Sequence, residues 1–255
     1  MFSAMPFSAI GTGTNPFIIE VDTSKAGSAN DAFQFTGAVG DYDVVAKQSG
    51  VVVQTFSNLS GQETITLSNG TGIYILEVTP KAINGFNRIR FNNTGDHEKL
   101  TKIKQWGNVL WSDFFRSFRL CINLTEITSS IAPNLSNVTN IGLMFQQIPN
   151  FNPDFSNWDV SNITDAQRFL RNSSNSNANV SGWDISNFTD MYEMLSYTNL
   201  STANLDACYQ NWSQLSLQSN VPFSAGTTKF SAAAQAGRDI LVNTYNWTIT
   251  DGGVV

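Results

Sequence analysis

The sequence predicts a β-rich α+β fold. We expect an N-terminal β-sandwich-like domain, then a short solenoid with one strand and one short helix in each repeat of about 25 residues, and finally a C-terminal cap. Two observations predict this fold: short runs of alternating apolar and polar residues fill the first third of the chain, and a Trp-Asp octapeptide recurs at a fixed interval in the second half.

The composition excludes several classes of protein. The chain has 255 residues, a formal net charge of −6 and only 13% charged residues. Its Lys and Arg are scattered along the sequence, which predicts no nucleic-acid partner. No stretch approaches the ~18 apolar residues that a membrane-spanning helix needs, so we predict no membrane insertion. The length suffices for one or two domains with a real core.

Residues 1–17 are predicted to be an N-terminal arm. They contain no Lys or Arg, and Pro6 and Gly11 interrupt their apolar residues, so we expect no secretory signal peptide. The segment is either a loose tail or a docking arm that contacts other copies in a homo-oligomer, or virion structural proteins. The apolar side chains that would make these contacts are Phe2, Met5, Phe7, Ile10 and Phe17.

Residues 18–95 are predicted to form a small β-sandwich of the Ig or PKD-like kind. Short runs rich in β-branched and aromatic residues are separated by Gly, Asn and Ser, which is the spacing of strands in a sandwich. Asn69 and Gly70 predict a tight hairpin turn. The runs are at residues 17–22, 33–36, 42–46, 51–53, 64–67 and 72–78.

The second half contains an internal repeat. WDVSNITD at residues 158–165 returns as WDISNFTD at 183–190, and PNLSNVTN at 133–140 fills the same frame 25 residues upstream. A period of 20–29 residues with a strand and a short helix is typical of the leucine-rich-repeat class, so we assign residues 96–214 to such repeats. One unit buries too few apolar side chains to fold alone, so stacked neighbours must stabilise it.

Each unit is predicted to begin with a strand and to end with a helix of about two turns. In the unit at 151–170 the strand directs Phe151, Phe155 and Trp158 inward, and the helix begins near Thr164, its expected N-cap. Residues 215–255 are predicted to close the array as a strand–helix–strand cap. Its strands are expected at 221–223 and 247–250 and its helix at 231–245.

Over residues 86–253 the sequence resembles the BspA-like surface proteins of Bacteroidetes and mycoplasmas, whose repeats are a leucine-rich-repeat variant. The octapeptide frame carries the resemblance, together with RIRFNNTGD (88–96), KLTKIKQWG (99–107), CINLT (121–125), LSTANL (200–205) and WTITDGG (247–253). The β-domain is less similar, since the family's Asp-Trp-Gly-Asp-Gly turn is replaced by AKQSG at 46–50. The resemblance implies surface recognition or adhesion, with no catalytic residues to transfer.

The residues that could carry chemistry each have a structural interpretation. Asp159, Asp165, Asp184 and Asp190 repeat with the array, as a cation site or acid–base pair would, but Asp also caps turns. The single histidine, His97, is expected in a solvated loop. Cys121 and Cys208 are expected to be buried thiols, and the six tryptophans are either core residues or a sugar-binding platform. We therefore predict no catalytic residue, no metal site and no cofactor.

The candidate binding surface consists of the polar residues that alternate outward along the predicted strands. We expect a non-enzymatic attachment protein that binds a host-surface protein or glycan through these residues. The lack of a signal peptide favours a phage spike or receptor-binding component on a virion surface; the alternatives are a bacterial cell-surface adhesin and a capsid decoration or vertex protein. The candidate residues are Asn152, Asp154, Ser156, Asn157, Asn177, Asn179 and Ser181.

Overall fold

A computed structural model describes residues 15–81 and 85–255. In this part of the chain most of the regular structure is β. The strands are β1 (Phe17–Asp22), β2 (Ala32–Gln34), β3 (Asp41–Gln48), β4 (Val51–Ser60), β5 (Thr64–Thr66), β6 (Ile73–Pro80), β7 (Leu100–Gln105), β8 (Glu126–Ile127), β9 (Pro222–Ser224) and β10 (Thr248–Thr250). The helices are α1 (Thr202–Trp212), the 3₁₀ turn η1 (Ala232–Ala234) and α2 (Gln235–Asn243).

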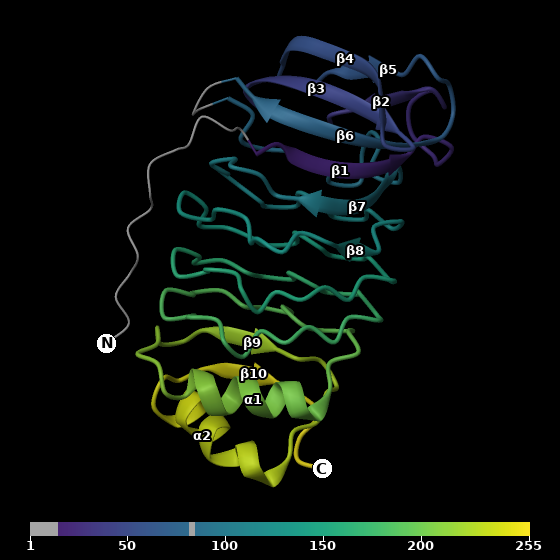
Figure 1. Ribbon diagram of the computed structural model, residues 1–255. Coiled ribbons are helices and arrows are strands. Elements are labelled where there is room, and N and C mark those ends of the chain that lie inside the picture. The colour runs from purple at the N-terminus through teal and green to yellow at the C-terminus, as the bar shows by residue number, and fades with distance from the viewer. Residues whose placement is uncertain (1–14, 82–84) are drawn as a thin grey trace.

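A six-stranded mixed sheet forms one end of the molecule (Figure 1). Its order is β4-β3-β6-β1-β7-β8, and all neighbours are antiparallel except β7 and β8. Alternate residues of β1, β3 and β6 are buried. A two-stranded ribbon of β2 and β5 packs on this face, where Phe35 meets Tyr42 at 5.3 Å between ring centroids.

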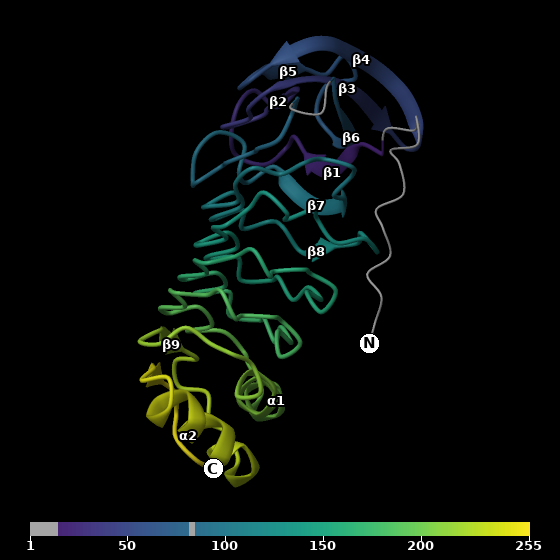
Figure 2. The same ribbon diagram turned by 90° about the vertical axis from the view of Figure 1, so that its left-hand side faces the viewer.

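Beyond β7 the chain runs in successive coils that lie parallel to one another (Figures 1 and 2). Backbone hydrogen bonds link residues about 25 positions apart, such as Thr189 N to Thr164 O at 2.8 Å. The coils are not regular strands. They pair through isolated parallel bridges, including Asn140 with Asp165 and Asp165 with Asp190.

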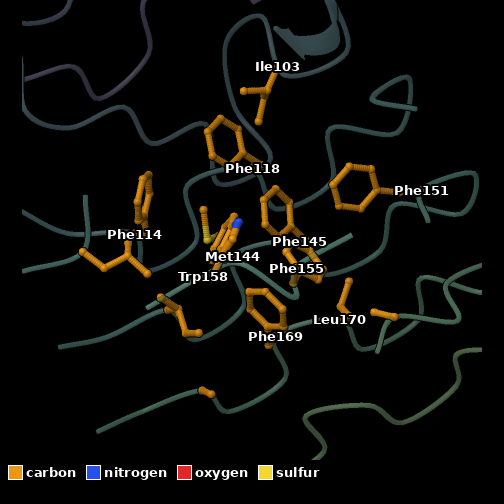
Figure 3. Close-up of a cluster of buried hydrophobic side chains, with 14 of the residues drawn as sticks. Ile103, Phe114, Phe118, Met144, Phe145, Phe151, Phe155, Trp158, Phe169 and Leu170 are labelled. Carbon is orange, nitrogen blue, oxygen red and sulfur yellow. The ribbon is translucent and has the colours of Figure 1, made fainter. Parts of the chain in front are cut away.

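Large aromatic side chains fill the interior of the stacked coils (Figure 3). Phe118 stacks on Phe145 at 5.4 Å between centroids, and Phe155 meets Trp158 at 4.9 Å. The buried residues form one continuous cluster from β1 to Trp247. Each fully buried side chain of this kind contributes about 1.5–3 kcal/mol, so the coils are held together mainly by this core.

The predicted fold class is wrong. A six-stranded sheet with a two-stranded ribbon takes the place of the expected sandwich, and this sheet continues into the repeats through β7 and β8. Among the described residues the α-helices are α1 and α2, both after residue 201, so the predicted helix in each repeat is absent from that part of the chain.

Residues in the left-handed backbone conformation explain why the repeats lack helices. In the segment predicted as a helix, Arg168 has φ 54° and Asn172 has φ 63°, which interrupts a right-handed helix within one turn. The backbone amides of this segment therefore donate to the next coil rather than within a helix. Alternate N–H groups donate to the carbonyls of the next coil: Ala166 to Asp190 (2.9 Å), Arg168 to Tyr192 (2.8 Å), Leu170 to Met194 (3.0 Å) and Asn172 to Ser196 (3.1 Å).

The C-terminal region contains the helices. In 215–255 the predicted strand, helix and strand correspond to β9, α2 and β10, with β9 and β10 parallel. Helix α1 was not predicted; Ser201 caps it by accepting a hydrogen bond from Asn204 N at 3.2 Å. In the described part of the chain, neither helix has the length and apolar character needed to span a bilayer.

Candidate functional site

Five of the seven candidate binding residues surround one shallow hollow on the stacked coils. The hollow has a volume of about 370 Å³, and its lining consists of Asn152, Pro153, Asp154, Ser156, Asn177 and Asn179. The other two candidates lie elsewhere. Asn157 is exposed and donates from Nδ2 to Ser130 O at 3.3 Å, whereas Ser181 is buried.

Alternation along the backbone creates the hollow. Phe151, Pro153 and Phe155 are buried, and Asn152 and Asp154 between them are exposed. The same pattern follows one coil later, where Ala178 and Val180 point inward and Asn179 outward. Extended backbone places successive side chains on opposite sides, so the polar residues of two neighbouring coils meet on the outer surface.

Hydrogen bonds between coils fix the asparagines. Asn152 Oδ1 accepts from Asn177 N at 2.7 Å, and Asn177 Oδ1 accepts from Ser201 N at 2.8 Å. Asn204 Nδ2 also donates to Asn177 O at 2.9 Å. Each amide side chain therefore satisfies a backbone donor of the next coil, which explains why Asn recurs at this position.

The remaining polar residues hold turns. Asp154 Oδ1 accepts from Ser156 N at 2.8 Å, and Asn179 Oδ1 accepts from Ser181 N at 3.0 Å. The hydrogen bond from Ser156 N lowers the pKa of Asp154, with the Ser156 side chain as the second cause. Within the described part of the chain, Nδ2 of Asn152 and Nδ2 of Asn179 have no hydrogen-bond partner. The hollow thus presents two asparagine side chains that are anchored at Oδ1 and have Nδ2 donors to offer.

The repeated carboxylates serve as turn acceptors. Asp159 Oδ1 accepts from Ser161 N at 3.1 Å, and Asp184 Oδ1 accepts from Ser186 N at 3.0 Å. Asp165 and Asp190 accept in the same way from the residues two positions later. Over residues 15–81 and 85–255, no three His, Cys, Asp or Glu side chains are grouped as metal ligands would be.

The tryptophans and cysteines belong to the core. All six tryptophans are buried, which leaves no surface platform of these residues for a sugar. Trp183 Nε1 donates to Phe155 O at 3.0 Å and so links two coils. Cys121 and Cys208 are free, buried thiols, and burial raises the pKa of each.

A buried ion pair beside His97 escaped the sequence analysis. His97 is half-buried, with Nδ1 3.3 Å from Gly95 O. Its neighbours Asp96 and Lys99 are completely buried, and Lys99 Nζ lies 3.5 Å from Asp96 Oδ2. The sequence analysis expects His97 in a solvated loop and does not predict the ion pair, because two opposite charges three residues apart in a sequence do not reveal that another segment covers them.

A second hollow was also missed. It has a volume of about 260 Å³ and is lined by Tyr192, Glu193, Ser196, Tyr197, Ser224, Gly226, Thr227 and Thr250. The side chains of Tyr192 and Tyr197 are exposed, at 47% and 61%. The sequence analysis predicts a helix at this position and therefore does not place these tyrosines together on one edge of the stacked coils.

The candidate arm residues Phe2, Met5, Phe7 and Ile10 lie outside the described residues. Phe17 is the first residue of β1 and is completely buried. Its ring stacks on Phe86 and Trp106 with centroids 5.9 and 6.0 Å away. Phe17 therefore stabilises the core and is not available to a partner.

Comparisons with known proteins identify a family. The family model described as "Mycoplasma protein of unknown function, DUF285" matches residues 95–235, more than half of the chain. No curated protein matches the chain, and no solved structure matches it. That the octapeptide repeat is a defining motif of the family stays a prediction. The matched region includes every residue that lines the first hollow and all but Thr250 of those that line the second, and the chain belongs to the mycoplasma family DUF285.

Proposed function

We propose that this chain is a non-enzymatic surface recognition and attachment module, which binds a protein or a glycan through the hollow around Asn152 and Asn179. The observation that carries the proposal is the hydrogen bonding of these two side-chain amides. Each Oδ1 is held by a backbone N–H, while each Nδ2 lacks a partner in the described residues. A ligand oxygen can accept from such fixed donors with little loss of side-chain entropy.

The shape and chemistry of the hollow favour recognition over catalysis. It is a shallow depression, and its one carboxylate, Asp154, already accepts a turn amide. A glycosidase needs two carboxyl groups about 5–10 Å apart on either side of a bond. Polar, uncharged side chains instead suit the hydrated contacts typical of protein and glycan surfaces. Display on a virion or on a cell surface stays a prediction from the sequence.

Isosteric substitutions test the proposal. In the variant Asn152→Asp/Asn179→Asp each Oδ1 can still accept its backbone bond, but the free donors are replaced by acceptors. The control is Asn30→Asp/Asn108→Asp, which changes the charge equally at two exposed residues away from the hollow. Labelled protein is applied to an array of purified glycans and extracellular-matrix proteins.

We expect the unmodified chain and the control to bind the same array components, and the hollow variant to bind them at least about tenfold more weakly, the equivalent of ~1.4 kcal/mol. Equal binding by the two variants would contradict the assignment of the hollow. Absence of binding to every component would contradict the attachment function.

A further inference from the structure

Arginines that are scattered along the sequence gather on one edge of the stack. The tight-turn segments at 115–120, 142–147, 167–172 and 192–197 occupy equivalent places in successive coils, and we call them the turn edge. Their equivalence follows from the backbone bonds of Arg116 to Gly142, Leu143 to Gln167 and Arg168 to Tyr192. Of the seven arginines of this acidic chain, four lie within the turn edge, Arg116, Arg119, Arg168 and Arg171, and Arg90 lies in the adjoining coil, where Phe91 N donates to Ser117 O at 2.9 Å.

Towards the six-stranded sheet, the turn edge carries Arg90, Arg116 and Arg119, and among the described residues Arg90 alone of the three pairs with a carboxylate. Arg90 pairs with Asp113, and the Arg116 guanidinium lies 4.6 Å from the ring centroid of Phe115. Arg119 Nε donates to Gln146 Oε1 at 2.7 Å, and no carboxylate among the described residues pairs with it. Burial and the nearby charge of Arg116 both lower the pKa of Arg119. Like charges held this close repel each other, and an anionic ligand would relieve the repulsion.

At the opposite end of the turn edge, two arginines lie beside the tyrosines that line the second hollow. Arg168 lies 5.4 Å from the ring centroid of Tyr192, and Arg171 lies 5.4 Å from that of Tyr197. Glu193 Oε2 is 2.8 Å from Arg168 Nε and 3.1 Å from Arg171 Nε, so one carboxylate balances two guanidinium groups. Both tyrosines line the hollow and are exposed.

The edge is long enough to bind an extended polymer. Four steps separate the coil of Arg90 from that of Tyr197, and at the ~4.8 Å spacing of paired chains they cover about 19 Å. A single small anion cannot contact both ends. An extended chain with an acidic group on successive units can pair with the arginines at one end and place a ring against the tyrosines at the other.

We propose that the turn edge binds an acidic polysaccharide, with its carboxylate or sulfate groups on Arg116 and Arg119 and a sugar ring in the hollow beside Tyr192 and Tyr197. The hollow favours a sugar over a nucleic acid, because the exposed residues Thr227 and Thr250 offer hydroxyl groups to a polyol. The site lies on a different part of the coils from the Asn152 hollow, and so it goes beyond the proposed function.

The test compares polymers of different charge. The intact chain is titrated with dextran sulfate, polygalacturonate, uncharged dextran and a single-stranded oligothymidylate. We expect binding to at least one of the two acidic polysaccharides, increasing from disaccharide to longer chains and weakening with added salt, since counterion release drives such association. Comparison of the two polymers distinguishes sulfate from carboxylate.

Two variants locate the site. Arg116→Gln/Arg119→Gln should lower the affinity at least about tenfold through the loss of two charge-assisted contacts. The control Lys25→Gln/Lys81→Gln has the same net charge and should stay within about twofold. Tyr192→Ser/Tyr197→Ser changes only exposed side chains, so the fold is retained, and it should weaken binding of the polysaccharide.

Three results would overturn the proposal. They are no binding to either acidic polysaccharide, equal affinity of the arginine variant and its lysine control, and oligothymidylate binding as tight as that of the polysaccharides. None of these depends on the Asn152 hollow, so the two proposals fail separately.

Discussion

Replacing Lys99 with methionine tests the role of the buried ion pair. Lys99 Nζ donates to the carbonyl oxygens of Ser28 (3.0 Å), Ala29 (2.9 Å) and Ala32 (2.8 Å). Asp96 accepts from Ser28 N at 2.5 Å and from Gln34 N at 2.7 Å. The pair therefore fastens the loop between β1 and β2 to the segment before β7. Lys99→Met keeps the apolar stem but leaves the Asp96 carboxylate without its cation.

The expected loss in the free energy of unfolding is large for a single side chain. Removing one member of a buried ion pair costs about 3–5 kcal/mol, because the remaining charge stays in a medium that solvates it poorly. Since ~1 kcal/mol shifts the midpoint of a chain of this size by about 2–4 °C, Lys99→Met should melt roughly 6–20 °C lower. Whole domains have a stability of only about 5–15 kcal/mol, so the effect is easily measured.

Urea unfolding and calorimetry measure the loss, and two variants interpret it. Lys25→Met removes the cation of the exposed pair with Asp22, in which Lys25 is 45% exposed, and should cost less than about 1 kcal/mol. Asp96→Asn/Lys99→Met removes both charges and should recover part of the loss. A Lys99→Met protein within 1 kcal/mol of the Lys25→Met protein would refute the reasoning.

Three other predictions concern the core and the turns. Trp183→Phe should cost about 1–3 kcal/mol in urea unfolding, because Phe155 O loses its buried partner, and Trp158→Phe, which breaks no such bond, should cost less. Gly40→Ala should prevent stable folding, as measured by circular dichroism, because its Cβ would lie 1.9 Å from Gly85 O. Gly50→Ala has a similar positive φ but no atom within 4 Å of the added Cβ, so it should cost only about 1–2 kcal/mol. Burial raises the pKa of the Cys121 thiol above its ordinary value of 9.0, so above pH 9.0 the unfolded chain loses this proton while the native chain keeps it. The free energy of unfolding is therefore unaffected by this thiol below pH 9.0 and should fall as the pH rises above it, so the urea midpoint should be lower at pH 10 than at pH 8. A native-state thiol that reacts with Ellman's reagent as fast as the unfolded one would contradict the burial of Cys121.

The inward residues could be predicted from the sequence, but the backbone between them could not. Phe151, Phe155 and Trp158 alternate with polar residues and are buried as expected. The segment at 164–172 has helix-forming residues, yet Arg168 and Asn172 adopt positive φ. Bonds from alternate amides to the next coil stabilise this conformation, and those partners lie 24 residues further along the chain. Local preference cannot reveal a hydrogen bond that exists only when coils stack.

The alternation of apolar and polar residues also predicted part of the candidate site. Alternation placed Asn152, Asp154 and Asn179 outward, and they line one hollow. It failed at Ser181, because the turn held by Asn179 Oδ1 changes the direction of the following side chain, which is buried. The turn edge could not be predicted, since Arg116 and Arg168 are 52 residues apart and only the stacking of coils places them on one edge.

Hydrogen–deuterium exchange tests the central claim, that the Asn152 hollow is a recognition surface, most directly. The chain is compared with and without the array component that it binds most tightly. Ligand seated in the hollow should slow exchange in peptides covering 152–157 and 177–181, with little change in β4 at the far end of the sheet. Unchanged exchange in both of these segments at saturating ligand would contradict the assignment.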